Sequence, residues 1–136
     1  MGATYHYNLQ RGKLYMVKNV LIVEDNPDLR RIVAAFLQAH GYETSEAATG
    51  YEAIEMAITE KPNLILLDFD LPDIRGTDVA QSLSKHQRTA HIPIIGCSGC
   101  FGTEFREEAL RAGMVDYLQK PFSAAGFVTV VKQFIL

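Results

Sequence analysis

The chain has 136 residues, of which 48% are hydrophobic, and it carries a formal net charge of −3. This length is enough for one domain with a single core, and the composition is that of a soluble globular protein. No basic stripe is visible, so we expect no direct contact with nucleic acid. No apolar run approaches about 18 residues and no signal-peptide pattern begins the chain. We therefore expect no membrane segment and a cytoplasmic location.

Residues 1–16 are rich in tyrosine and show no periodicity that predicts a helix or a strand. They are interpreted as an N-terminal tail: a flexible segment, an expression remnant, or residues upstream of a start at Met16. No function is assigned to them. The remaining residues, 17–136, are predicted to form one domain.

Short apolar runs bounded by turn signals recur along this domain. The central one, Leu64–Leu67, lies between Pro62-Asn63 and Pro72-Asp73 and ends in Asp68. A run this short and this apolar predicts a strand that is buried on both faces. Further strands are predicted at residues 20–23, 42–47, 91–96 and 115–118.

A segment with helical spacing follows each predicted strand. The starts are indicated by Asn26-Pro27, Thr49-Gly50, Gly76-Thr77, Thr103 and Ser123. Strands and helices that alternate in this way predict a parallel sheet with helices on both faces. The fold class is a doubly wound α/β domain with five parallel strands and five helices.

Reactive side chains gather where the predicted strands end. Glu24 and Asp25 follow the first strand, Asp68 ends the third, and Ser98 and Lys120 follow the fourth and fifth. The carboxyl ends of parallel strands meet at one rim, where ligands bind in such folds. Close carboxylates repel by roughly 4 kcal/mol per pair at an effective dielectric near 20, so we expect a neutralising cation.

A site made of oxygen ligands favours a hard ion, and Mg²⁺ is the natural candidate. A metal beside a carboxylate, a lysine and a hydroxyl suits the handling of a phosphoryl group. An aspartate can itself be the nucleophile and form an aspartyl phosphate. The residues alone leave open which carboxylate would do so.

From about residue 17 to 135 the chain resembles the receiver domains of two-component response regulators, in particular the chemotaxis regulators. The motifs that carry the resemblance are Leu21-Ile22-Val23-Glu24-Asp25-Asn26, Asp68-x-x-x-Pro72 with Gly76, Pro93-Ile94-Ile95-x-x-Ser98, and Tyr117-x-x-Lys120-Pro121-Phe122. The resemblance implies a flavodoxin-like (βα)5 receiver fold.

The resemblance also implies roles. Asp68 would accept a phosphoryl group from a phosphohistidine of a sensor histidine kinase or a histidine phosphotransfer protein. Glu24, Asp25, Asp68 and the backbone carbonyl of Asp70 would hold Mg²⁺. The domain would be a phosphoacceptor in signalling and not an enzyme with turnover, although it could assist its own phosphorylation and dephosphorylation.

Other residues would respond to the phosphoryl group. Lys120 would pair with it, Ser98 would move to hydrogen-bond it, and Tyr117 would turn inward as Ser98 moves. The resemblance further implies a cis peptide bond between Lys120 and Pro121. Phosphorylation would then bias two existing loop arrangements.

Two more positions are expected to tune the lifetime of the phosphoryl group: Asp70, two residues after Asp68, and Cys100, two residues after Ser98. Cys97 and Cys100 form a Cys-x-x-Cys, which is interpreted as two reduced thiols in a loop. A disulfide that locks this loop is the weaker hypothesis. His6, His40, His86 and His91 are interpreted as surface residues.

Two alternatives compete with this function. Asp68-Phe69-Asp70 resembles the Asp-x-Asp of haloacid-dehalogenase-type phosphatases, which would make the protein an aspartyl-phosphate phosphohydrolase. In those enzymes, however, the motif ends the first strand, whereas here it ends the third predicted strand. This alternative also gives no role to Glu24 and Asp25. The other alternative is a receiver that binds partners without phosphorylation.

The output surface is expected on residues 103–136, made by the fourth helix, fifth strand and fifth helix. The stripe of Phe127, Val130, Val131, Phe134 and Ile135 is predicted to face the core. Val128 lies off this stripe and is expected to be partly exposed, available to an unknown downstream partner or to a homodimer.

Overall fold

A single sheet of five parallel strands forms the centre of the protein. The computed structural model describes residues 5–99 and 102–135. The strands are β3 (Asn19–Val23), β4 (Glu43–Ala47), β5 (Leu64–Asp68), β6 (Ile94–Ser98) and β7 (Asp116–Gln119), and they lie side by side in the order β4-β3-β5-β6-β7. The prediction of a doubly wound parallel sheet is confirmed.

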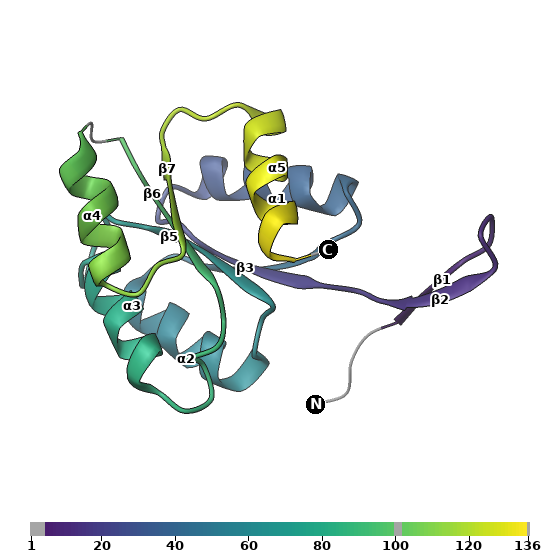
Figure 1. Cartoon of the computed structure of the whole chain (residues 1–136), viewed down its shortest axis with the longest axis horizontal. Helices are drawn as coiled ribbons and strands as arrows, with labels where there is room; N and C mark the ends of the chain where they lie inside the picture. Colours follow the sequence, from purple (N-terminus) through teal and green to yellow (C-terminus); the bar gives the residue numbers. More distant parts are fainter. Residues whose placement is uncertain (1–4, 100–101, 136) are drawn as a thin grey trace.

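Five helices cover the two faces of this sheet (Figure 1). They are α1 (Pro27–Ala39), α2 (Gly50–Glu60), α3 (Gly76–Lys85), α4 (Thr103–Arg111) and α5 (Ala124–Phe134). Residues of α1 and α5 join one core cluster, and residues of α2, α3 and α4 join the other. The sheet is therefore buried from both sides, as a parallel sheet requires.

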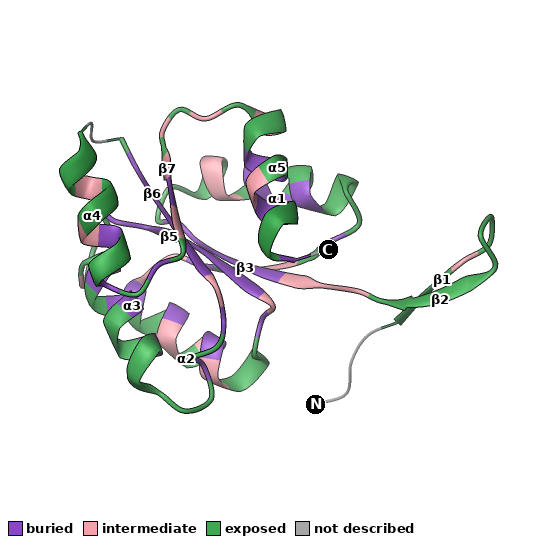
Figure 2. Ribbon diagram, in the orientation of Figure 1, coloured by how far each residue is buried: buried purple, intermediate pink, exposed green. Residues whose placement is uncertain are grey.

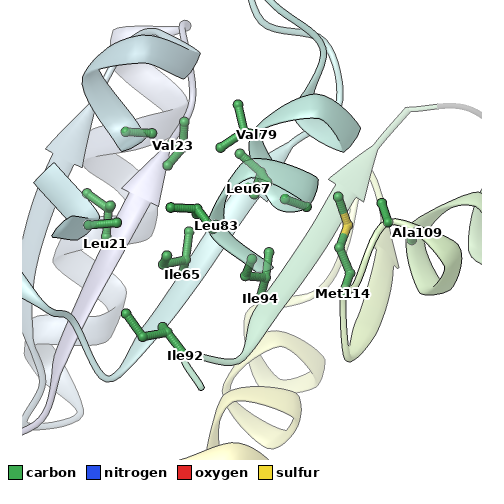
Figure 3. Close-up of a cluster of buried hydrophobic side chains, with 14 of the residues drawn as sticks. Leu21, Val23, Ile65, Leu67, Val79, Leu83, Ile92, Ile94, Ala109 and Met114 are labelled. Carbon is green, nitrogen blue, oxygen red and sulfur yellow. The ribbon is translucent and has the colours of Figure 1, made fainter. Parts of the chain in front are cut away.

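Successive side chains along a strand point to opposite faces of the sheet, so the residues of each apolar run belong alternately to two core clusters. On β5, Ile65 and Leu67 face the α2, α3 and α4 side (Figure 3), whereas Leu64 and Leu66 face α1 and α5. All four are almost completely buried. A strand with both faces in a core reads as a continuous apolar run, which explains why period-two patterning is absent here.

The strand boundaries differ slightly from the predictions. β6 begins at Ile94, after a turn in which the backbone N–H of Ile92 donates to the carbonyl of Thr89 (3.0 Å), so residues 91–93 lie outside the strand. β7 begins at Asp116 and not at residue 115. Four helix starts match the predicted ones, but the hydroxyl of Thr103 does not cap α4, whose N-cap is Gly102 with φ of 114°.

The buried face of α5 was predicted only in part: Phe127, Val131 and Ile135 are buried as expected, but two other residues differ from the prediction. Val128 is buried, with 7% of its surface exposed, whereas Phe134 is 36% exposed. The face that packs on the sheet is centred on Phe127, Val128 and Val131, and Phe127 also stacks on Phe122 with ring centroids 5.4 Å apart. Val128 is therefore part of the core and cannot serve as an exposed contact for a partner or a homodimer.

The N-terminal segment forms a β-hairpin, which the sequence did not predict. β1 (Tyr5–Asn8) pairs antiparallel with β2 (Lys13–Met16) in a separate two-stranded sheet. The hairpin continues from the amino end of β3 and projects away from the rest of the domain (Figure 1). Its residues are exposed except for Asn8, which is half-buried (Figure 2).

Among the described residues, no helix combines the length and the apolar character that crossing a membrane would need.

Candidate functional site

The strand order brings the predicted site residues to one rim. β3 and β6 lie on either side of β5, and β7 lies beside β6. Val23 is level with Leu67, Asp68 with Cys97, and Ser98 with Gln119. The residues that end or follow these strands therefore share the carboxyl edge of the sheet.

Three carboxylates meet at this edge. Glu24, Asp25 and Asp68 each offer an oxygen, and these oxygens lie within 4.8 Å of one another. Glu24 and Asp68 are buried, with 5% and 3% of their surfaces exposed, whereas Asp25 is exposed. An all-oxygen, anionic donor set that is open to solvent on one side fits Mg²⁺, which keeps several of its waters when bound.

Lys120, the residue after β7, approaches two of these carboxylates. Its Nζ lies 2.5 Å from Oε1 of Glu24 and 3.2 Å from Oδ2 of Asp68. Burial tends to lower the pKa of Lys120, but the hydrogen bond that Lys120 donates to Glu24 and the attraction of the carboxylates outweigh it and raise this pKa well above its ordinary value. Lys120 is therefore a fixed positive charge at the site. The Lys120–Pro121 peptide bond is cis, as predicted.

Glu24 is held by its backbone as well as by its side chain. Its N–H donates to the carbonyl of Ala47 (3.0 Å), and its own carbonyl accepts a hydrogen bond from Nη1 of Arg30 (2.7 Å). The second carboxylate oxygen, Oε2, accepts from the backbone N–H of Asn26 (3.2 Å), which caps α1. Glu24 thus occupies a fixed position at the rim.

Arg30 was not identified from the sequence. It lies on α1, and its Nε also donates to Oε1 of Glu46 on β4 at 2.9 Å. Its side chain is mostly buried. The guanidinium group therefore connects the edge strand to the backbone of the acidic pair. Only its position one turn into a helix that begins beside Glu24 could have indicated this contact.

The loop after β5 is tied to Asp68. The backbone N–H of Asp70 donates to Oδ1 of Asp68 (3.2 Å), and the N–H of Gly76 donates to the carbonyl of Phe69 (2.9 Å). A Cβ atom at Gly76 would lie 2.2 Å from the carbonyl oxygen of Asp68. Position 76 therefore has to be glycine for the chain to pass this close to the carbonyl of Asp68.

Asp73 fastens the same loop to α2. Its carboxylate accepts hydrogen bonds from the backbone N–H groups of Gly50 (2.8 Å) and Tyr51 (2.9 Å) at the start of this helix. Desolvation tends to raise the pKa of Asp73, but these backbone donors together lower it below its ordinary value. The sequence showed Asp73 only as a turn residue.

Ser98 and Tyr117 are both buried beside the site. The carbonyl of Ser98 accepts a hydrogen bond from the N–H of Lys120 (2.8 Å). The ring of Tyr117 packs edge-on against Phe69, the residue after Asp68, with centroids 5.5 Å apart. Tyr117 also lines a pocket with Gly102, Thr103, Arg106 and Gln119, next to the start of α4.

Cys97 lies within β6 and not at a helix start. Burial, with the nearby charge of Asp68, raises the pKa of its thiol far above its ordinary value, so the thiol stays protonated. The prediction that Cys97 lies in a loop is therefore wrong: it is a buried strand residue, and a protonated thiol is a poor partner for disulfide exchange. Cys100 lies outside the described residues. The four histidines are exposed.

Comparison with known proteins gives consistent matches. The family described as response regulator receiver domain matches residues 20–132. The polar-differentiation response regulator DivK of Brucella ovis is 35% identical over 121 residues, which is 88% of this chain and 98% of that protein.

Solved structures match equally well. The chemotaxis response regulator CheY4 of Vibrio cholerae superposes with a TM-score of 0.83 at 25% identity, covering 88% of this chain and 99% of that one. The receiver domain of the sensor histidine kinase PA1611 from Pseudomonas aeruginosa PAO1 has a TM-score of 0.81 at 31% identity, covering 88% and 98%. That structure has a magnesium ion coordinated in its active-site cleft.

Proposed function

Because the chain belongs to the response regulator receiver domain family, we propose that it accepts a phosphoryl group on Asp68 in a two-component phosphorelay. The observation that carries the proposal is the position of the Asp68 carboxylate. It is buried between two further carboxylates and the Nζ of Lys120. The donor would be a phosphohistidine of a cytoplasmic sensor histidine kinase or histidine phosphotransfer protein.

In this reaction an oxygen of the Asp68 carboxylate attacks the phosphorus of the phosphohistidine. The new oxygen–phosphorus bond forms as the phosphorus–nitrogen bond breaks, and the imidazole leaves with the bonding electron pair. Oδ1 of Asp68 already accepts a hydrogen bond from the N–H of Asp70, which orients the carboxylate. Mg²⁺, when bound by Glu24, Asp25, Asp68 and the carbonyl of Asp70, would offset the charge that develops on the phosphoryl oxygens.

Lys120 would change partners during the reaction. It is now bonded to Glu24 and Asp68, and a phosphoryl group on Asp68 would supply new anionic oxygens within its reach. The raised pKa of Lys120 keeps it charged for this role. The receiver domain of PA1611, 31% identical to this chain, has a magnesium ion in its active-site cleft, which supports a cation at the corresponding edge of this sheet.

Phosphorylation would then be read through Ser98 and Tyr117. Both residues are buried, with Tyr117 packed against Phe69, and the pocket beside Tyr117 offers space between β7 and the start of α4 in which its ring could take another position. The surface of α4, β7 and α5 is the proposed output face, and its downstream target would be a protein. Asp70, exposed at the mouth of the site, is proposed to tune the lifetime of the phosphoryl group.

The test is the mass of the intact protein after incubation with Mg²⁺ and a small acyl phosphate. The expected result is the gain of one phosphoryl group. This gain should not occur when Mg²⁺ is chelated or in Asp68→Asn. Asp70→Asn, an equivalent change two residues away, should still be labelled. If phosphorylation is fast but short-lived, beryllofluoride should bind in its place. A protein that takes up neither group is not a phosphoacceptor, and the interaction-module alternative would then replace this proposal.

A further inference from the structure

The N-terminal hairpin is an addition to the receiver fold. The family match begins at residue 20, after both of its strands. The DivK alignment spans 98% of that protein but only 88% of this chain. A two-stranded hairpin is marginally stable in water by itself and needs a further surface or strand to pack against. The proposed phosphoryl site does not use the hairpin, which extends from the opposite, amino end of β3 (Figure 1).

One face of the hairpin is apolar. Its cross-strand pairs on that face are Tyr5 with Met16 and Tyr7 with Leu14. These four side chains are 59%, 39%, 53% and 63% exposed, in that order. An exposed group of large apolar side chains on a projecting element is typical of an interaction surface. If two copies each bury such a hairpin against a strand of the other copy, the surface removed from solvent would be on the order of 1,000 Å², the lower limit for a specific interface.

The charge of this segment indicates an acidic partner. Residues 1–23 contain Arg11, Lys13 and Lys18 but no aspartate or glutamate. From residue 24 onward there are ten basic and sixteen acidic residues, so residues 24–136 carry a net charge of −6 against +3 on residues 1–23, two of these three positive charges being on the hairpin itself. The hairpin and the body of a second copy are therefore complementary in charge.

The body also offers a strand edge of the right charge. β4 is an outer strand of the five-stranded sheet, so one of its edges is not paired within that sheet. It carries Glu43 and Glu46, and Glu46 is already bonded to Arg30. Glu43 is exposed. An open edge with unpaired backbone groups is a template for an added strand.

We propose that the hairpin of one copy adds to the β4 edge of a second copy, and that two-fold symmetry makes the contact twice. Both sheets would be extended by the partner's hairpin, with Lys13 of one chain facing Glu43 of the other. Such an isologous arrangement closes on itself and forms a dimer, not a fibre. It leaves the carboxyl rim and the α4, β7 and α5 surface uncovered, and it does not depend on phosphorylation.

The test is the mass of the full chain in solution, measured by sedimentation or light scattering at about 100 µM. The expected mass is twice 15.2 kDa. Lys13→Glu alone and Glu43→Lys alone place like charges opposite each other and should each weaken the dimer more than about tenfold. An equal mixture of these two variants should form heterodimers, because both contacts then pair opposite charges. The double variant K13E/E43K should dimerise again for the same reason.

Lys132→Glu, an equal charge change on the exposed side of α5, is the control and should leave the dimer unchanged. Two outcomes would overturn the proposal: a monomer at this concentration, and a dimer that neither single reversal weakens. If the monomer also binds vesicles of anionic lipid and not of neutral lipid, the hairpin would be assigned to a membrane surface. Since each variant retains Asp68, phosphorylation of the same samples reports separately on the proposed function.

Discussion

The carboxyl rim and the N-terminal hairpin break the usual rule of burial in opposite directions. At the rim, Glu24 and Asp68 are buried charges, whereas the hairpin exposes Tyr7 and Leu14. At each of these places the stability of the fold alone does not explain why that type of residue is present. The buried charges are matched inside the chain by Lys120, but the apolar hairpin has to find its match elsewhere. This contrast supports the two proposals, the rim as a site for chemistry and the hairpin as a site for association.

The largest effect is expected where the rim depends on a close backbone approach. Gly76→Ala would place a methyl group 2.2 Å from the carbonyl oxygen of Asp68. The loop after β5 would have to shift, and we expect a loss of more than about 3 kcal/mol in the free energy of unfolding, measured with urea. Gly99→Ala, with no atom of the described residues within 4 Å of the new Cβ, should be nearly neutral. Equal stability of the two variants would show that the loop is not constrained as described.

Removing Lys120, the cation that pairs with the buried carboxylates, should have the next largest effect on the free energy of unfolding. Lys120→Met leaves Glu24 and Asp68 without their cation, at a cost of about 2 kcal/mol, since partial exposure reduces the roughly 3–5 kcal/mol of a fully buried pair. The pKa of Lys120 is raised on folding. Its stabilisation is therefore complete below about pH 10.5 and is lost as the pH rises through the folded value.

The difference in unfolding free energy between wild type and Lys120→Met should accordingly be constant near neutral pH and shrink above about pH 10.5. Lys132→Met removes an exposed lysine from α5 and controls for the general effect of alkali. A gap between wild type and Lys120→Met that widens with pH would contradict the pairing of Lys120 with the two carboxylates.

Arg30 provides a finer test of how the rim is positioned. Arg30→Ala frees the carbonyl of Glu24 and should weaken Mg²⁺ binding about tenfold or more, since groups that orient metal ligands typically have this effect. Arg31→Ala, one residue away and exposed, removes the same charge and should change the affinity little. The readout is the Mg²⁺ dissociation constant by titration calorimetry. Equal constants for both variants would limit Arg30 to a structural role.

The smallest effect is expected at the hairpin. Leu14→Ser replaces a side chain that is 63% exposed, so the unfolding free energy of the dilute, monomeric chain should change by less than about 0.5 kcal/mol. At high concentration the same change should weaken self-association. A large loss of stability in the dilute chain would mean that Leu14 packs on its own domain, and the contrast between rim and hairpin would fail.

The sequence predicts most of the central fold because its strands are continuous apolar runs. Such a run as Leu64–Leu67 needs a core on both faces, and this requirement leaves few folds. The hairpin escaped prediction because its strands have only four residues each and are exposed. Its turn did leave a signal: Asn8 bonds the N–H of Arg11, and Gly12 has φ of 62°. Because the apolar residues of the hairpin are not buried against the core of their own domain, these turn signals do not specify a strand.

At the rim, too, some residues could be predicted from the sequence and others could not. Asp25, Asp68 and Lys120 are predictable because strand ends in a parallel sheet converge on one edge. Arg30 and Asp73 are not, because their partners Glu46 and Gly50 lie 16 and 23 residues away and their contacts depend on how helices dock. The face of α5 was misjudged for a related reason. Its sequence has more apolar residues than one face can hold, and packing decides that Val128 is buried and Phe134 is not.

The most direct test of the rim as a phosphoryl site is to locate the modified residue. The protein would be incubated with Mg²⁺ and an acyl phosphate, reduced with borohydride, and sequenced by tandem mass spectrometry. Reduction converts a phosphorylated aspartate to homoserine, and the predicted result is homoserine at position 68 and at no other aspartate. Homoserine at Asp25 or Asp70 would show that the nucleophile is misassigned. Phosphorylation confined to residues away from the rim would contradict the assignment of this edge of the sheet as the reactive site.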